Sequence, residues 1–382
     1  MKMGAKQSWG MALVVSCTFF YFLIFAQFAF LHRLSEVDSE GELLDLSMLC
    51  MGLGGVLGCA VVARYFRRES ASAWIGSGFI GCGVLAPLVG MLPGLGIFPM
   101  YGLGIGFSVG VLTVSIASTL RERLPVRSLG LWTGVGVGIA YFLSNVPVVF
   151  RSDSVDQCLM AGVACLLGVI VCIVMPWEAK SDEREVFERV DFRFYNSGGL
   201  WLACGFFLVL VWFDSAAFYV IQETAELKGQ SWGGESMLWY NGIVHFVAAV
   251  LAGWLLDRGV LIGLWIVSIF GLSVGLIGIQ SGGSSWAMVS TFVYVGAVSA
   301  YSTALTAFVG LSRDGTGLWP AQRRAAFIYG VAGWFGSAMG IGMAKDLHRV
   351  PVWFVAIAFV YFFVAGGWLV RKRMVLRGGE VF

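Results

Sequence analysis

The stretch "GLWLACGFFLVLVWFDSAAFYVIQ", residues 199–222, decides the class of fold. Asp214 is its only charged side chain. A helix needs about 20 apolar residues to cross the hydrocarbon core of a bilayer, and this run is long enough. An ionised aspartate near the middle of such a helix costs about 2.5–3.5 kcal/mol on insertion scales. We therefore expect a membrane-spanning helix whose carboxyl group has a functional or structural task.

The composition of the whole chain is typical of a membrane protein. Of its 382 residues, 58% are hydrophobic and only 13% are charged, and the mean hydropathy is +0.82. The net charge is +2, and no Rossmann fingerprint or P-loop is present, so no nucleic acid or nucleotide is expected as a partner. No cofactor is expected either, and no HExxH or nucleophile motif at membrane depth suggests an enzyme.

Twelve apolar segments are long enough to cross a bilayer and predict an all-α polytopic membrane protein. They cover residues 10–31, 43–64, 72–92, 95–119, 128–149, 157–176, 199–222, 236–256, 260–280, 285–310, 325–344 and 350–370. The longest loop, residues 177–198, separates an N-terminal six-helix half, residues 1–176, from a C-terminal six-helix half, residues 199–382. This loop is compatible with a short helix on the membrane surface or with a solvated linker.

The positive charges predict how the chain is oriented. If both termini face the cytoplasm, the cytoplasmic segments contain 20 of the 25 Lys and Arg residues, as the positive-inside rule requires. The first apolar run is too long for a cleaved signal peptide and has no small-residue cleavage site after it. We expect a multi-pass protein of the inner (cytoplasmic) membrane, with the N- and C-termini in the cytoplasm and the lipid bilayer as its surroundings.

The loop between the eighth and ninth spans carries a motif. In "GWLLDRG" (253–259), Gly253, Asp257 and Arg258 have the spacing of Gly-x-x-x-Asp-Arg. This loop resembles the conserved cytoplasmic motif of the major facilitator superfamily, in which two six-helix halves form a transporter. The resemblance implies a cytoplasmic latch: Asp257 caps the N-terminus of a neighbouring helix, and Arg258 pairs with an acidic group on the adjacent helix.

A second, incomplete copy of the motif lies between the second and third spans, in "GCAVVARYFRR". It keeps Gly58, Arg64, Arg67 and Arg68 but has Ala63 where the family usually has an aspartate. With two copies and twelve spans, the resemblance covers the whole chain in topology. It implies a secondary transporter that works by alternating access.

The first spans of the two halves are also similar in sequence. Aligning "FFYFLIFAQFAF" (19–30) with "FFLVLVWFDSAAF" (206–218) places Gln27 opposite Asp214. His245 lies at about the same depth in the next span, so it could touch Asp214. An Asp beside a His in a medium of low dielectric constant can bind and release a proton near neutral pH, which predicts proton coupling.

A purely structural role for Asp214 stays open at this point. Its carboxylate could accept hydrogen bonds from Ser215, Tyr240 or Asn241 and so hold the end of span seven in place. His245 by itself could equally be an interhelical hydrogen-bonding group.

The resemblance also suggests which residues line a central cavity, because spans 1, 4, 7 and 10 do so in that family. Besides Gln27 and Asp214, these spans contain Tyr21, Tyr101, Tyr219, Gln222, Tyr294, Tyr301 and Ser302. No Lys or Arg is embedded among them, whereas transporters of strongly anionic solutes generally need such a cation. The substrate is therefore expected to be a small neutral, zwitterionic or cationic molecule.

Two alternative functions remain. Met339 and Met343 are four residues apart in span eleven and could serve a copper importer of the same fold, because soft sulfur ligands suit Cu(I). Span seven, however, lacks the methionine pair that such importers carry. The incomplete first motif is also compatible with a membrane scaffold or sensor that transports nothing. In each case we expect a monomer.

Overall fold

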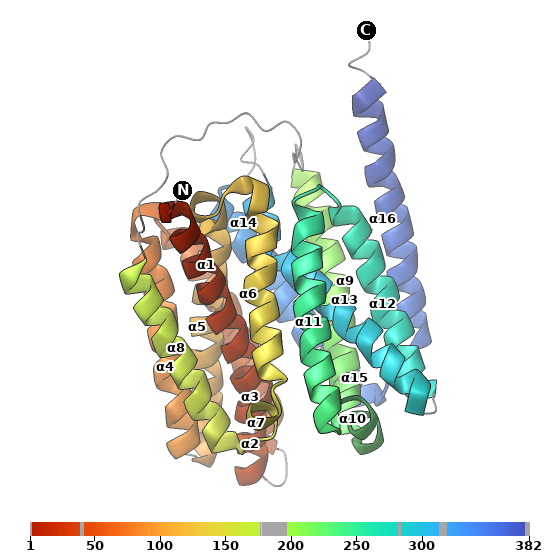
Figure 1. Ribbon diagram of the computed structural model, residues 1–382. Helices are drawn as coiled ribbons and strands as arrows, with labels where there is room; N and C mark the ends of the chain where they lie inside the picture. Colours follow the sequence, from red (N-terminus) through yellow and green to blue (C-terminus); the bar gives the residue numbers. More distant parts are fainter. Residues whose placement is uncertain are drawn as a thin grey trace.

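Long apolar helices make up nearly all of the structure, because a chain in lipid must satisfy its backbone hydrogen bonds within each helix. The computed structural model describes residues 2–38, 42–92, 94–175, 177, 197–281, 284–312 and 319–378. Within these ranges eleven helices are long and apolar enough to cross a membrane, and a shorter apolar helix covers Val352–Trp368. The predicted all-α membrane fold is confirmed (Figure 1).

The helices before the 177–198 loop form one group. They are α1 (Lys2–Tyr21), η1 (Phe22–Ala29), α2 (Phe30–Val37), α3 (Glu42–Tyr65), η2 (Arg68–Ser70), α4 (Ala71–Met91), η3 (Leu95–Ile97), α5 (Phe98–Arg123), η4 (Val126–Ser128), α6 (Leu129–Ser144), α7 (Pro147–Phe150) and α8 (Ser154–Val174). The first span is therefore continuous through α1, η1 and α2. Its middle part, η1, is a π-helix.

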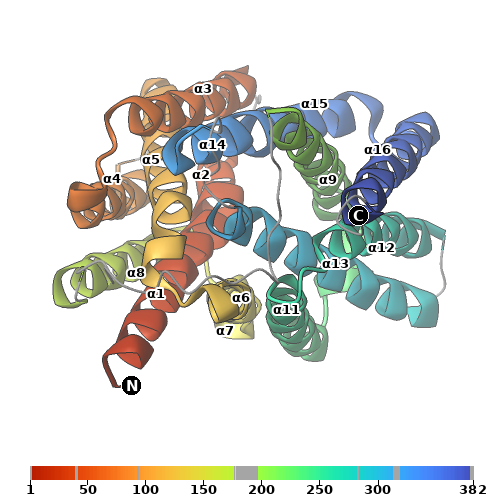
Figure 2. The same ribbon diagram turned by 90° about the horizontal axis from the view of Figure 1, so that it is seen from above.

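The helices after the loop form the second group. They are α9 (Ser197–Glu223), α10 (Ala225–Trp232), α11 (Glu235–Leu256), α12 (Leu261–Ser281), α13 (Ser284–Leu311), α14 (Ala321–Ile328), η5 (Tyr329–Phe335), α15 (Gly336–Leu347) and α16 (Val352–Gly378). Seen from above, the two groups lie side by side, with α14 beside α3 and α5 (Figure 2). Most of the loop, including its proposed surface helix, lies outside the described residues, so the division into halves stays a prediction.

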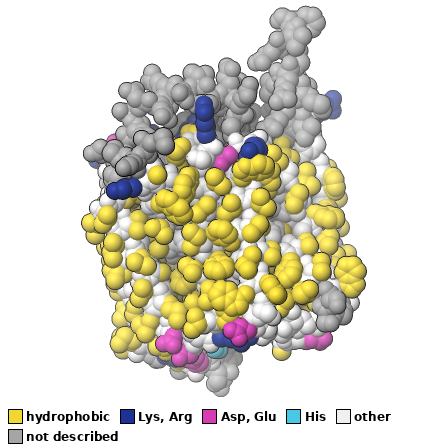
Figure 3. Space-filling view, viewed as in Figure 1, with side chains coloured by type: hydrophobic (Ala, Val, Ile, Leu, Met, Phe, Trp, Pro, Cys, Tyr) yellow, Lys and Arg dark blue, Asp and Glu magenta, His cyan; other side chains and the backbone are white. Residues whose placement is uncertain are grey.

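Both termini lie at one end of the bundle (Figure 1), which we call the proximal end; the opposite end, where α10 lies, is the distal end. On the face seen in Figure 3, the surface between the two ends is a broad apolar band, which we call the apolar belt, and charged side chains gather at the ends. Such a belt matches the hydrocarbon core of a bilayer. The orientation of the two ends in the membrane stays a prediction.

Glycines bring α3 and α5 into backbone contact. A Cβ atom on Gly106 would overlap the carbonyl oxygen of Met51 and lie 2.8 Å from the nitrogen of Gly55. Gly58 faces the backbone of Phe107 in the same way. Small residues allow this close approach, which is how helices associate in lipid, where no hydrophobic effect drives them together.

We expect Gly106→Val to destabilise the fold by about 3 kcal/mol or more, because the new side chain meets backbone atoms that cannot move without separating two helices. Gly52→Val on α3 is the matched control, since nothing lies within 4 Å of its Cβ position. Thermal melting of the purified variants in detergent measures the difference. Equal melting temperatures for the two variants would contradict the backbone contact.

A second glycine seam joins the two groups of helices. On α6, Gly130 and Gly134 face the carbonyl groups of Gly253 and Ala249 on α11. This close contact therefore lies between the two groups. α6 and α11 therefore meet backbone to backbone near the proximal end.

Candidate functional site

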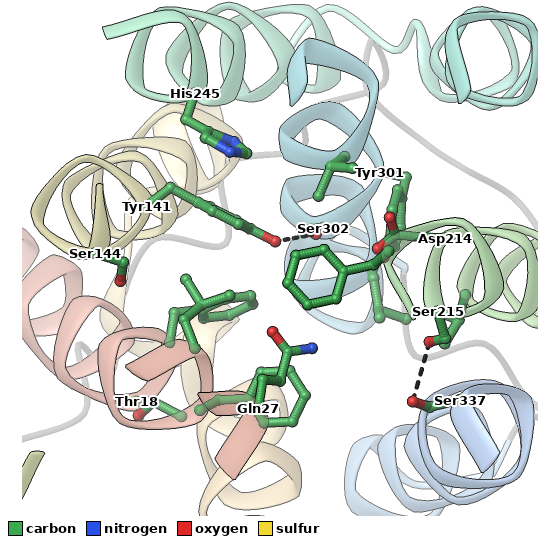
Figure 4. A pocket seen from close by; sticks show the side chains of 18 of the residues that line it. Thr18, Gln27, Tyr141, Ser144, Asp214, Ser215, His245, Tyr301, Ser302 and Ser337 are labelled. Atoms are coloured by element: carbon green, nitrogen blue, oxygen red, sulfur yellow. Dashed lines mark hydrogen bonds between the residues drawn. The ribbon is translucent and has the colours of Figure 1, made fainter. Parts of the chain in front are cut away.

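A cavity of about 190 Å³ lies between the two groups of helices. It is lined by 27 residues, many of them aromatic. Its polar members include Asn145 and, labelled in Figure 4, Gln27, Tyr141, Asp214, His245 and Ser302. None of the lining residues in the described part of the chain is Lys or Arg. Asp214 is the only carboxylate among them, so the cavity favours neutral or positive molecules.

Asp214 is held by two tyrosines of α13. The hydroxyl of Tyr294 donates to Oδ1 of Asp214 at 2.6 Å, and the hydroxyl of Tyr301 donates to Oδ2. The two tyrosines are seven residues apart, so they lie on one face of α13, two turns from each other. Both carboxylate oxygens thus have a donor from another helix, which offsets part of the cost of desolvating a charge in the membrane.

His245 contacts α13 and α6 from the opposite side of the cavity. Its Nδ1 is 2.7 Å from the Ser299 hydroxyl, and its ring stacks on Tyr141 at 4.3 Å between centroids. The Tyr141 hydroxyl in turn lies 3.1 Å from the Ser302 hydroxyl. His245 and Asp214 line the same cavity, but each is hydrogen-bonded to α13 rather than to the other (Figure 4).

Two π-helical segments border the cavity. η1 contributes Gln27, whose amide points into the cavity (Figure 4), and η5 contributes Tyr329 and Trp334. A π-helix closes its hydrogen bonds one residue later than an α-helix, so it changes the direction of the following side chains, and such segments often mark functional sites. The polar group of span one and the aromatic groups of span eleven therefore reach the same space.

Near the proximal end, Asp257, which follows the last turn of α11, contacts α6. Its Oδ1 accepts from the backbone nitrogen of Gly130 at 2.7 Å, and its Oδ2 accepts from that of Leu131 at 2.9 Å. These are free N–H groups of the first turn of α6, so the carboxylate caps a helix of the other group. Arg258 lies over its own helix instead, with its guanidinium 3.4 Å from the Trp254 ring centroid.

Solved structures with the same architecture identify the fold. The chain is similar to the proton:xylose symporter XylE, with a TM-score of 0.67, 14% identity and coverage of 97% of this chain and 96% of that one. It is also similar to the human organic anion transporter MFSD10, with a TM-score of 0.62, 11% identity and 96% coverage of both chains. A third similar structure is that of the E. coli fucose:proton symporter FucP, with a TM-score of 0.60, 14% identity and coverage of 94% of this chain and 98% of that one.

The chain has the major facilitator superfamily fold. No protein-family model matches its sequence, and no curated protein is similar to it in sequence. The fold is therefore visible in the arrangement of the helices rather than in residue identities.

The major facilitator fold brings only some of the expected residues to the cavity. Gln27, Asp214, His245, Tyr294, Tyr301 and Ser302 line it. Tyr21, Tyr101, Tyr219 and Gln222 are not among the lining residues. Spacing along the helix explains one of these differences: Tyr21 is six residues before Gln27 and so lies on another face of span one, where it is fully buried.

Several lining residues were not expected from the sequence. Tyr141, Ser144 and Asn145 lie on span five and at its end, although the family pattern placed only spans 1, 4, 7 and 10 at the cavity. Trp232 lies on α10, in the segment between spans seven and eight. No local signal distinguishes these side chains from others in apolar or connecting segments, so only the packing of the helices identifies them.

The methionine pair proposed for copper lies away from the cavity. Met339 and Met343 are on α15, and neither is among the lining residues. Met339 is 39% exposed on the surface of the bundle. No group of three or more His, Cys, Asp or Glu side chains suited to a metal ion exists among the described residues.

The incomplete first copy of the loop motif makes a different contact from the second. Nε of Arg68 pairs with Oε1 of Glu122, at the end of α5, at 3.0 Å, while Arg64 and Arg67 are exposed. The first copy, which lacks the aspartate, thus makes the ion pair between an arginine and an acidic group. The second copy, which has the aspartate, makes the helix cap.

The latch predicts a pH dependence. Burial raises the pKa of Asp257 from 3.8 to about 6, against the opposing effects of its bonds to Leu131 and Gly130 and of Arg258. Because the folded form binds the proton more tightly than the unfolded form, this contribution to stability is full below about pH 4 and is lost as the pH rises through 6. We expect the melting temperature of the wild type minus that of Asp257→Asn to fall between pH 4 and 6 and then stay level. A difference that rises with pH would contradict the burial of this carboxyl group.

Proposed function

We propose that the protein is a secondary transporter that moves a small neutral, zwitterionic or cationic solute through the central cavity by alternating access, with protons as the coupling ion. The observation that carries this proposal is Asp214: a carboxylate in the middle of the membrane, open to the cavity, with two tyrosine donors and with no Lys or Arg among the lining residues of the described chain. Such a group can bind a proton or a polar solute where no fixed cation competes.

The division of the chain supports alternating access. The helices of residues 1–176 and those of residues 199–382 contact each other at both ends of the cavity, through Asp257 at the proximal end and through Lys345 and Asp45 at the distal end. Rocking of one half against the other would break one set of these contacts at a time. XylE and FucP, which share the fold, are described as proton symporters.

A thermal-stability screen of the detergent-purified protein tests the proposal. Amino acids, nucleosides, sugars, vitamins, organic cations and Cu(I) are added at pH 5.5 and 7.5, because a ligand of the folded state raises the melting temperature by mass action. We expect a small uncharged or cationic solute to stabilise the protein. That solute must then enter proteoliposomes that contain the protein faster than empty ones.

Two results of this screen would favour other functions. Stabilisation by Cu(I) that disappears in Met339→Leu/Met343→Leu would favour a copper importer. Stabilisation by a solute without any flux in proteoliposomes would favour a membrane sensor. We place the protein in the cytoplasmic membrane, as a monomer with both termini in the cytoplasm; cysteine labelling of tagged termini from either side tests that orientation.

A further inference from the structure

The short helix α10 is not one of the membrane spans, yet it contributes to the central cavity. It connects α9 to α11 at the distal end of the bundle (Figure 1). Its last residue, Trp232, is only 6% exposed and lines the cavity. A loop segment that ends in a buried aromatic side chain is positioned to close the cavity from this end.

Trp232 and the residue after it join the two groups of helices. The indole Nε1 of Trp232 donates to Oδ1 of Asn145 at 3.2 Å, and Nη2 of Arg151 donates to the carbonyl of Gly233 at 2.7 Å. Asn145 is itself held by its Nδ2, which donates to the carbonyl of Tyr141 at 2.9 Å. The contacts of α10 and the residue after it therefore connect the second group to the end of α6 and to Arg151, beside the cavity.

The same indole ring faces the proposed solute site. Its centroid is 6.5 Å from that of Tyr294, the tyrosine that donates to Asp214, and 6.5 Å from that of Phe218. Phe218 also meets Phe28 of the first group at 5.6 Å. Trp232 is thus part of an aromatic cluster, contributed by both groups of helices, beside the tyrosine that donates to the carboxylate.

The closed position of α10 leaves polar atoms without hydrogen bonds. Ser231 and Asn241 are fully buried, and neither the Ser231 hydroxyl nor Oδ1 of Asn241 has a hydrogen-bond partner in the described part of the chain. Buried polar atoms without partners disfavour a state relative to one in which water reaches them. Opening of α10 would hydrate both atoms, which offsets part of the cost of breaking the contacts of the closed position.

We propose that α10 is a lid over the distal mouth of the cavity, and that Trp232 both closes this mouth, through its hydrogen bond to Asn145, and forms the wall of the site that contacts the solute. The lid would open and close with each transport cycle, so this inference rests on the proposed transport function. A bulky solute that reached Asp214 would contact Trp232, which makes this residue a determinant of substrate size.

Access of a reagent to the cavity tests the lid without any substrate. A single reporter, Thr18→Cys, places a thiol on the cavity wall, within the first membrane-spanning helix. In membrane vesicles of known orientation, a membrane-impermeant methanethiosulfonate is added from the distal side, and the labelling rate is corrected for protein without the reporter. We expect Trp232→Ala to raise the rate by about tenfold or more. Trp232→Phe and Asn145→Ala, which each remove the hydrogen bond between these two side chains, should raise it by about three- to tenfold.

A matched control and a double mutant separate the lid from general loosening. Trp239→Phe changes a tryptophan that is 41% exposed on α11, near the same end, and should leave the labelling rate unchanged. Because one hydrogen bond is shared, Trp232→Phe/Asn145→Ala should label no faster than the more strongly affected single variant. Each variant is used only if its melting temperature shows that it is folded.

Three results would overturn the lid. The first is an equal labelling rate for the wild type and Trp232→Ala, and the second is an equally large increase in the labelling rate with Trp239→Phe. The third is an effect of the double variant Trp232→Phe/Asn145→Ala that equals the sum of the effects of the two single variants. None of these depends on flux, so the lid can fail while transport holds. Conversely, the labelling rates could change as expected in a protein that shows no measurable flux. The lid would then be supported and the proposed transport function would be wrong.

Discussion

Asp214→Asn is expected to abolish the dependence of solute uptake on a proton gradient. The carboxylate is the only acid lining the cavity among the described residues, and an amide cannot bind and release a proton in its place. The amide NH₂ cannot accept from a tyrosine as a carboxylate oxygen does, so the donation from either Tyr294 or Tyr301 to a charged oxygen is lost and that hydroxyl can only accept from the amide. Losing one hydrogen bond to a charged group costs about 1.5–3 kcal/mol. The equilibrium constant for the contact between residue 214 and α13 therefore falls about tenfold to hundredfold.

The measurement is uptake into proteoliposomes of the solute that stabilises the protein most. Uptake is followed with and without an imposed pH gradient, for the wild type and for Asp214→Asn. We expect the variant to equilibrate the solute without accumulating it. If the variant still accumulates solute in response to the gradient, Asp214 is not the coupling group.

Three further variants define the role of the site. Tyr294→Phe and Tyr301→Phe each remove one donor but keep the carboxylate, so proton-driven accumulation should persist with a shifted pH dependence. Asp156→Asn, on the first turn of α8 and away from the cavity, is the matched control and should behave as the wild type. A tyrosine variant that loses coupling as completely as Asp214→Asn would indicate that the pair works as one unit.

Gly253→Val is expected to force the proximal end of the cavity open. A Cβ atom at this position would lie 2.7 Å from the carbonyl carbon of Gly130 and 3.0 Å from Cα of Leu131, both backbone atoms of α6. α6 and α11 must therefore separate, and the two hydrogen bonds of Asp257 to α6 are lost with the contact. Because this seam lies between the two groups of helices, the expected result is a shift toward the state open at the proximal end rather than unfolding.

The Thr18→Cys reporter measures this opening from the proximal side of oriented vesicles. We expect labelling of Gly253→Val to be about tenfold faster or more, which corresponds to the loss of about 1.4 kcal/mol or more of closing free energy. Asp257→Ala, which removes only the cap, should give a smaller increase in the same direction. Gly52→Val, with free space at its Cβ position, should give none. Unchanged labelling in Gly253→Val would mean that the seam does not control access.

Much of the architecture follows from local properties of the sequence. The length of each apolar run sets whether a helix can cross the bilayer, so the spans and the all-α class could be predicted before any contact was known. One charged residue in a long apolar run is equally local, and it marked Asp214 as a site. The Gly-x-x-x-Asp-Arg spacing also pointed to the helix-capping contact of Asp257.

The partners of these residues could not be predicted, because each residue along a helix turns by about 100° and helices rotate freely about their axes until they pack. Asp214 was assigned possible partners nearby in sequence, yet its donors, Tyr294 and Tyr301, lie 80 and 87 residues away. The rotation of span one about its axis also explains why Tyr21, which was expected at the cavity, does not line it.

The sequence by itself determined that this protein lies in a membrane, that long apolar helices make up its fold, and that a carboxyl group sits within one of them, because these depend only on the polarity of consecutive residues. The tertiary structure alone decided what surrounds that carboxyl group. Trp232 and Asn145, 87 residues apart, meet over the cavity only because the two groups of helices pack together. Contacts of this kind depend on the relative rotation and position of whole helices, which no short stretch of sequence encodes.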